Sequence, residues 1–311
     1  MIQNLGAQTL AVLLVLAIVL GPAAAAVHLL SRRKRLALIE RRSPLATNLL
    51  RPPGHTLRRQ LDEGRVDLGG ELMVLVLIPA FLLAFLYVTS LMTGRQNPMW
   101  LLIVTAVGIT AFSAYQIRKL LSHAKQMEQW GLGLDAEMAA GQELDQLMRS
   151  GAAVFHDLAA VKFNIDHVVV ARQGVFAVET KGYRKPNRNG GAADATVIYD
   201  GKVLKFPEWS GTGALAQADR QARWLSEWLT GVTGEKIEAT PVLALPGWFV
   251  DRRGGGPVMV LSGSEIKNHL LKARKAVPLT EAQVERVAHQ VEQRCRDVKP
   301  WYRPIEESNQ S

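Results

Sequence analysis

Three ionisable residues lie in short runs whose other side chains are typical of buried β-strands. Asp166 interrupts a Val-rich run, and Glu179 and Lys181 end the next run with one residue between them. Alternate side chains of a strand point to the same face, so Glu179 and Lys181 share a face. A short turn pairs the two runs antiparallel, which can bring Asp166 alongside Glu179. The sequence therefore predicts two carboxylates and one ammonium together on a β-hairpin.

This combination of groups suits the hydrolysis of a phosphodiester bond. Two carboxylates can hold a hard divalent cation, and we expect Asp166, Glu179 and the backbone carbonyl of Thr180 to bind Mg²⁺ or Mn²⁺. Such an ion polarises a phosphoryl oxygen and lowers the pKa of a bound water, while Lys181 can orient that water or stabilise the developing negative charge. A buried ion pair with no catalytic role is the alternative, because two carboxylates and a lysine at this spacing also occur by chance.

The elements that must position these residues follow from the periodicity of apolar side chains and from turn residues. In chain order we expect a helix (136–148), three strands (152–158, 163–171, 175–180), a short hairpin around Asp200 and Gly201 (197–199, 203–206), a helix (214–229), two strands (240–245, 258–261) and two closing helices (264–273, 280–298). The order helix, three strands, helix, strand predicts an α/β sandwich.

Three apolar segments without a charged side chain precede this domain, at residues 10–30, 72–92 and 99–117. Each is long enough to cross a lipid bilayer as a helix, and the last two form a hairpin. Basic residues follow the first and third segments, whereas the link between the second and third holds only Arg95. The positive-inside rule then places the N-terminus outside and the C-terminal domain in the cytoplasm. We expect a multi-pass protein of a bacterial inner membrane. Because the spans are uncharged, anchoring is the expected role and an ion pathway is not.

Composition agrees with a mixed chain of membrane segments and one domain. The 311 residues carry a formal net charge of +9, and the mean hydropathy is near zero, which suits neither an ordinary soluble enzyme nor a polytopic transporter. The single cysteine, Cys295, excludes a disulfide framework and a zinc ribbon. The predicted parts are a first transmembrane helix (1–31), a basic cytoplasmic loop (32–71), a transmembrane hairpin (72–117), a juxtamembrane linker helix (118–130), a catalytic domain (131–275) and a C-terminal helix and tail (276–311).

Several short segments together resemble one known family. They are Glu137 in the first helix of the domain, residues 154–158 (VFHDL), 164–167 (NIDH) and 174–181 (GVFAVETK), and residues 216–218 (AQA) in the later helix. On these residues the stretch 137–245 resembles the nuclease-related domain, a branch of the PD-(D/E)xK nuclease superfamily. The resemblance does not extend to the apolar segments or to the last helix.

The resemblance implies a restriction-endonuclease-like α-β-β-β-α-β sandwich, here preceded by three transmembrane helices. It also implies that Asp166 and Glu179 bind the metal and that Lys181 acts on the attacking water.

Residues from the neighbouring helices complete the implied site. Glu137 and Gln217 would support the metal or the water. Glu143, further along the same helix as Glu137, is the alternative carboxylate, and either of the two can instead be a solvated helix residue. His167 is expected to be a packing or hydrogen-bonding neighbour and not a ligand.

Two functions from different classes follow. The first is a membrane-anchored, metal-dependent nuclease that hydrolyses nucleic acid, DNA in the first place, at the cytoplasmic face. The second is a catalytically inactive nucleic-acid-binding or scaffold protein at the membrane. The presence of Asp166 and Glu179 favours the enzyme, because a binding module gains nothing from carboxylates beside a polyanion.

Basic and aromatic residues near the site suit a nucleic-acid partner. Arg184, Lys185 and Arg188 lie in a stretch rich in Gly, Asn and Pro, which predicts an exposed loop able to meet phosphates. Four tryptophans can offer stacking surfaces for bases, namely Trp209, Trp224, Trp228 and Trp248. Trp224 and Trp228 are four residues apart on a predicted helix and are instead expected in the core. No GxxxxGK[ST] loop occurs, so we expect no nucleotide cofactor, and any use of ATP would come from an unidentified protein partner.

Overall fold

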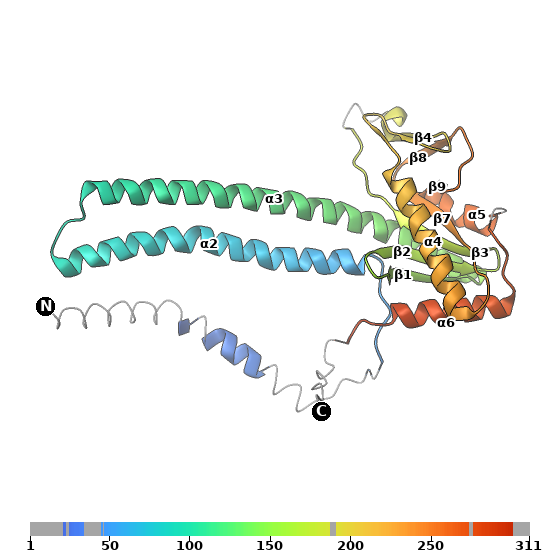
Figure 1. Cartoon of the computed structure of the whole chain (residues 1–311), viewed down its shortest axis with the longest axis horizontal. Coiled ribbons are helices and arrows are strands. Elements are labelled where there is room, and N and C mark those ends of the chain that lie inside the picture. Colours follow the sequence, from blue (N-terminus) through green and yellow to red (C-terminus); the bar gives the residue numbers. More distant parts are fainter. Residues whose placement is uncertain are drawn as a thin grey trace. The chain divides into compact units, whose positions relative to one another are not determined.

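The computed structural model describes residues 21–22, 25–33, 45, 47–186, 191–273 and 276–300 (Figure 1). The chain divides into two compact units. One consists of Leu49–Gly70 and Lys119–Val298, and the other holds Glu71–Arg118 together with both ends of the chain. The first unit contains both β-sheets and all of the candidate site residues.

The second unit is built from the apolar parts of two long helices. Helix α2 spans His55–Thr93 and helix α3 spans Met99–Asp145. By length and composition both are able to cross a membrane, and their most apolar stretches bury almost no residues within the protein. The first predicted span, residues 10–30, lies largely outside the described residues. Of this region the structure describes residues 21–22 and 25–33, which are helical. Two candidate spans, and not three, are therefore found in the described part of the chain.

Both helices extend well beyond the predicted spans. Helix α2 begins at His55 and not at residue 72, so part of the predicted basic loop is helical. Helix α3 joins the predicted third span, the linker helix and the first helix of the domain without a break. Residues 118–130 are mostly good helix formers and contain no proline, which lets the backbone hydrogen bonds continue through them.

The main sheet has five strands in the order β1-β2-β3-β7-β9. Their bounds are Ala153–Ala159, Asn164–Ala171, Gly174–Thr180, Ala239–Leu245 and Met259–Ser262. Strands β1, β2 and β3 pair antiparallel, whereas β7 runs parallel to β3 and β9 parallel to β7. The five strands predicted from apolar patterning are confirmed, and their pairing brings the ends of β3 and β7 to one edge of the sheet.

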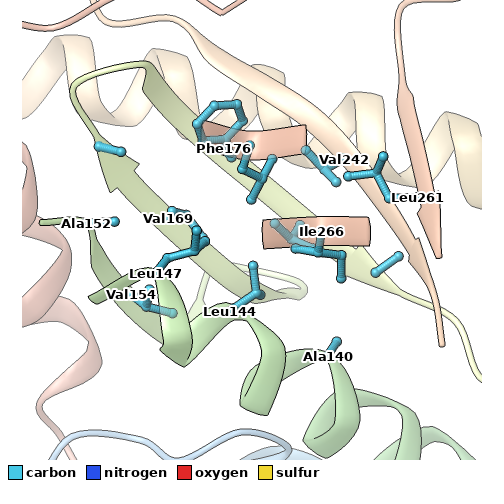
Figure 2. Packing of buried hydrophobic residues seen from close by; sticks show 14 of the residues in the cluster. Ala140, Leu144, Leu147, Ala152, Val154, Val169, Phe176, Val242, Leu261 and Ile266 are labelled. Atoms are coloured by element: carbon cyan, nitrogen blue, oxygen red, sulfur yellow. The ribbon is translucent and has the colours of Figure 1, made fainter. Parts of the chain in front are cut away.

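Helices cover both faces of the main sheet. They are the end of α3, α4 (Gly213–Thr233), α5 (Ile266–Leu271) and α6 (Glu281–Cys295). On one face, Leu144 of α3 and Ile266 of α5 pack with Phe176 of β3 in a buried apolar cluster (Figure 2). On the other face, Leu225 of α4 and Val291 of α6 belong to a second buried cluster. The result is a mixed α/β fold with helices on each side of a sheet.

A second sheet of four short strands has the order β6-β5-β4-β8. The bounds are Thr196–Tyr199 for β4, Leu204–Lys205 for β5, Ser210–Gly211 for β6 and Phe249–Arg252 for β8. Strands β4 and β5 form the predicted hairpin, whose turn is held by Asp200 Oδ1, the acceptor for the N–H groups of Lys202 and Val203. Strands β6 and β8 lie outside the predicted elements because each is too short to show a repeat. Short 3₁₀ helices cover Gln146–Ser150, Ala192–Ala195 and Gly263–Glu265.

Candidate functional site

Glu179 lies near the end of strand β3 and is held from two directions. Its side chain is 2% exposed, and Lys181 Nζ lies 2.6 Å from its Oε1. Gln221 of helix α4 donates from Nε2 to the other oxygen, Oε2, at 2.5 Å. The same nitrogen also donates to the backbone carbonyl of Asn164 at 3.1 Å. Strand β3 and helix α4 together therefore fix the orientation of this carboxylate.

Asp166 joins Glu179 from the neighbouring strand β2. The strands are antiparallel and His167 pairs with Val178, so the next position along the register places Asp166 opposite Glu179. Asp166 Oδ2 accepts a hydrogen bond from the backbone N–H of Thr180 at 2.6 Å. Burial raises the pKa of Asp166 well above its usual range, and the charge of Glu179 raises it further. The two predicted carboxylates thus lie close enough to repel each other.

Glu137 of helix α3 is the third carboxylate of this cluster. Burial raises the pKa of Glu137 to about 8, with further contributions from the charges of Asp157 and Glu179. The backbone N–H of Gly54 donates a hydrogen bond to it. Glu143, the alternative carboxylate, instead accepts from Gln146 of its own chain segment at 3.3 Å. The structure therefore brings Glu137 to the other site residues and leaves Glu143 apart.

Lys181 supplies the positive charge among these acids. Burial alone would lower the pKa of Lys181, but the charges of Glu179 and Asp166 and the hydrogen bond with Glu179 outweigh burial and raise it. The side chain therefore carries an ammonium at neutral pH. Its backbone N–H donates to the carbonyl of Ala244 in β7 at 3.0 Å, which continues the parallel pairing of Thr180 with Ala244.

Gln217, the amide predicted from the sequence, lies one turn before Gln221 on helix α4. Gln217 lines the site cavity, but the amide that contacts Glu179 belongs to Gln221. A sequence signal for Gln221 does exist. It is a polar residue in the buried stripe of the helix formed by Ala218, Ala222 and Leu225, where a polar side chain needs a specific partner.

A cavity of about 540 Å³ opens beside the carboxylates. Glu137, Asp166 and Gln217 lie in its wall together with residues from the β1–β2 turn. Residues from the segment predicted as a basic loop also line it, namely Thr56, Leu57 and Gln60. The cavity therefore gives solvent and small ions access to two of the three acids.

A family comparison agrees with this geometry. The model of the nuclease-related domain family matches residues 132–246. Residues 132–246 are thus similar to the nuclease-related domain, and the match does not extend to the rest of the chain. The match includes the strands β1, β2 and β3 and helix α4, which carry most of the site. A search of the curated proteins and a search of the solved structures each gave no match.

A segment outside the family match is attached to the nuclease-related domain through Asp157. Thr56 donates to Asp157 Oδ2 from its backbone N–H at 2.6 Å and from its hydroxyl at 2.7 Å, and Asn164 donates to Oδ1 at 2.7 Å. Arg51 donates to the backbone carbonyl of Asp157 at 3.0 Å and forms two hydrogen bonds with the carboxylate of Asp297 at 2.7 and 2.6 Å. The start of helix α2 is thereby held against the site.

Two histidines of the nuclease-related domain form a buried pair on the opposite face of β2. His156 Nε2 lies 3.0 Å from Asp145 Oδ1, and the two Nδ1 atoms of His156 and His167 are 2.8 Å apart. If Nε2–H of His156 donates to the carboxylate, its Nδ1 accepts from His167. Burial lowers the pKa of His156, and burial and His156 lower that of His167 well below the usual value. His167 is therefore a neutral hydrogen-bonding neighbour, as expected.

The acids of the site carry an excess of negative charge that a single hard cation would balance. In the described part of the chain no group of three or more His, Cys, Asp or Glu side chains is arranged as a metal centre. Asp166 and Glu179, however, lie beside Glu137 with repulsion that a divalent cation would relieve. Among the described residues the buried Oε1 of Gln221 also has no hydrogen-bond partner, and it needs a donor or a cation nearby.

Proposed function

We propose that the protein is a metal-dependent nuclease, anchored in a bacterial inner membrane, that hydrolyses phosphodiester bonds of nucleic acid. The observation that carries this proposal is the convergence of Asp166, Glu179 and Lys181 within the nuclease-related domain. The mixed α/β fold with its helix, three strands, helix and strand supports a restriction-endonuclease-like sandwich.

Each site residue has a role in this proposal. Asp166, Glu179 and the carbonyl of Thr180 hold Mg²⁺ or Mn²⁺, which when bound polarises the phosphoryl group and lowers the pKa of a water. Lys181 remains an ammonium and orients the attacking water or stabilises negative charge on the phosphate. Glu137 and Gln217, which line the cavity beside Asp166, support the metal or the water from the neighbouring helices.

The substrate that we propose is DNA, bound without a nucleotide cofactor. Arg184 and Lys185 follow the site directly and are exposed, which suits contacts with phosphates. Arg188, the third basic residue of the predicted loop, lies outside the described residues. Any ATP-dependent step would need a separate protein partner.

The membrane assignment rests on the two long apolar helices. Helices α2 and α3 would cross the bilayer as a hairpin. A first span at residues 10–30 is proposed from their apolar sequence alone. With basic residues on the inner side, the N-terminus would be outside and the nuclease-related domain in the cytoplasm.

One observation favours the second candidate, an inactive nucleic-acid-binding or scaffold protein. Both oxygens of Glu179 already have protein partners, Lys181 and Gln221. A metal would have to share or displace one of them. If the ion pair is only structural, the protein would bind nucleic acid without cutting it.

The deciding experiment uses the full chain in lipid nanodiscs. Supercoiled, linear and single-stranded DNA and RNA are incubated with Mg²⁺, Mn²⁺ or EDTA. We expect cleavage that requires the metal and is lost in Lys181→Ala and Asp166→Ala. Glu143→Gln, which alters a carboxylate of helix α3 outside the cluster, should cleave as the parent does. Binding without cleavage under every condition would support the scaffold protein instead.

A further inference from the structure

An aromatic cluster lies directly beside the proposed nuclease site. The backbone N–H of Lys181 donates to Ala244, so the chain that continues to Tyr183 runs next to the chain that continues from β7 to Trp248. Trp248 Nε1 donates to the backbone carbonyl of Tyr183 at 3.2 Å. Tyr183 thus sits two residues beyond Lys181, at the edge where β3 and β7 end.

Four rings make up this cluster: Tyr183, Phe206, Trp209 and Trp248. The ring of Tyr183 meets those of Phe206 and Trp209 edge to face, with centroids 5.0 and 4.9 Å apart. Phe206 and Trp209 are stacked at 4.2 Å, and Phe206 meets Trp248 at 4.9 Å. Phe206 and Trp248 are buried, whereas Trp209 is 42% exposed. The buried rings therefore hold one large aromatic surface rigidly at the protein exterior.

Positive charge borders this surface. The ammonium of Lys185 lies next to Gly247, the residue before Trp248. Its Nζ is 3.9 Å from the position that a Cβ atom on Gly247 would occupy. Lys181 lies on the other side of Tyr183 along the chain. The charges of Lys181 and Glu179 both act on the Tyr183 hydroxyl, although burial is the main reason that its pKa is raised. Aromatic and cationic groups thus extend from the site outward.

We propose that the aromatic cluster binds unpaired nucleotides of single-stranded nucleic acid, with a base stacked on Trp209 and a phosphate near Lys185. The proposal rests on the proposed function and adds a preference for strands whose bases are accessible. In a duplex the base faces are already stacked on each other, so Trp209 has nothing to stack on. Single strands expose these faces, and one base on an aromatic ring changes affinity by about 10- to 100-fold.

Binding without cleavage tests this directly. The full chain in lipid nanodiscs, with EDTA present, is titrated into a fluorescently labelled oligothymidylate and into a duplex of equal length, and anisotropy is recorded. We expect Trp209→Ala to weaken binding of the single strand by about 10-fold or more and to change duplex binding by less than about 2-fold. Trp209→Phe should retain most of the affinity, because a smaller ring still stacks.

Two further variants complete the test. Phe249→Ala removes an exposed ring of β8 that is outside the cluster, and it should bind as the parent does. Lys185→Ala should lower the slope of log affinity against log salt by about 0.7, the value for one phosphate contact on a single strand. Parent-like single-strand binding by Trp209→Ala, or an equal loss in Phe249→Ala, would overturn the proposal.

The outcome is separable from that of the nuclease proposal. Metal-dependent cleavage combined with parent-like binding by Trp209→Ala would reject the stacking surface and keep the nuclease. Single-strand binding that depends on Trp209, without cleavage in Mg²⁺ or Mn²⁺, would keep the stacking surface and reject the nuclease.

Discussion

Excess negative charge distinguishes the candidate site at the scale of single residues. Glu137, Asp166 and Glu179 converge, and Lys181 provides the nearby positive charge. Folding raises the pKa of Glu137 to about 8 and that of Asp166 well above its usual range. Carboxyl groups whose pKa is raised by folding make the free energy of unfolding smaller at neutral pH than in acid. The reason is that the folded state binds protons that the unfolded state releases at neutral pH. Such an imbalance is common where a protein binds a cation or transfers protons.

Gln221 should matter more for stability than Gln217. Replacing Gln221 by Leu leaves Oε2 of the buried Glu179 without its donor, at a cost of about 1–3 kcal/mol in the free energy of unfolding. Gln217→Leu, one turn earlier on the same helix and half-buried, should change it by less than about 0.5 kcal/mol. Denaturant unfolding of both variants measures the difference. Equal effects would mean that the amide of Gln221 does not hold Glu179.

The histidine pair predicts a loss of stability in mild acid. Because folding lowers the pKa of His156 and His167, the unfolded chain binds more protons than the folded one once the pH falls below about 6.5. The contribution of the pair is present above that pH and is lost below it. In the double variant His156→Leu with His167→Leu, both hydrogen-bonding partners are removed together. Lowering the pH from 7.5 to 5.5 should lower the midpoint temperature of thermal unfolding more in the parent than in the double variant. Equal decreases of the midpoint with pH in the two proteins would reject the prediction.

At the scale of elements, local patterns predict strands better than they predict where the long helices begin. The sequences of β2 and β3 by themselves show the alternation and the apolar content that are typical of strands. Helix α2 begins at His55 because Asp157, far away in the sequence, accepts from the N–H of Thr56, and no local pattern contains that contact. Strand β8 is similarly defined by its parallel partner β4 and not by its own residues.

Arg51 should hold the start of helix α2 against the nuclease-related domain. It joins Asp157 and Asp297, so Arg51→Ala removes two charged hydrogen bonds and one to a carbonyl. We expect a loss of about 1–3 kcal/mol and faster amide exchange at the first turn of α2. The control is Arg59→Ala, which breaks only an exposed ion pair with Glu63 and should cost less than about 0.5 kcal/mol. Unchanged exchange in Arg51→Ala, measured by mass spectrometry, would contradict this role.

At the scale of the whole molecule, the compact unit that carries the site is assembled from two separate stretches of chain. Composition and hydropathy predict the apolar hairpin and the domain that follows it. They do not predict that Leu49–Gly70, on the far side of the hairpin in sequence, belongs with that domain. The reason is physical, since the segment is attached by Gly54, Thr56 and the β-bridge between Leu49 and Val298, all contacts between residues distant in sequence.

A fragment that begins at residue 126 should therefore be a poor substitute for the whole protein. It lacks Arg51 and Thr56, so Oδ2 of the buried Asp157 loses both of its donors while Oδ1 keeps Asn164, and an acceptor left without a donor costs about 1–3 kcal/mol. A second fragment, in which a flexible Gly/Ser linker replaces Glu71–Arg118, keeps Leu49–Gly70 and should avoid that loss. Denaturant unfolding of the two fragments compares them. Equal free energies of unfolding would mean that residues 49–70 do not stabilise the domain. A lower free energy of unfolding in the shorter fragment would mean that these residues are part of the folded domain.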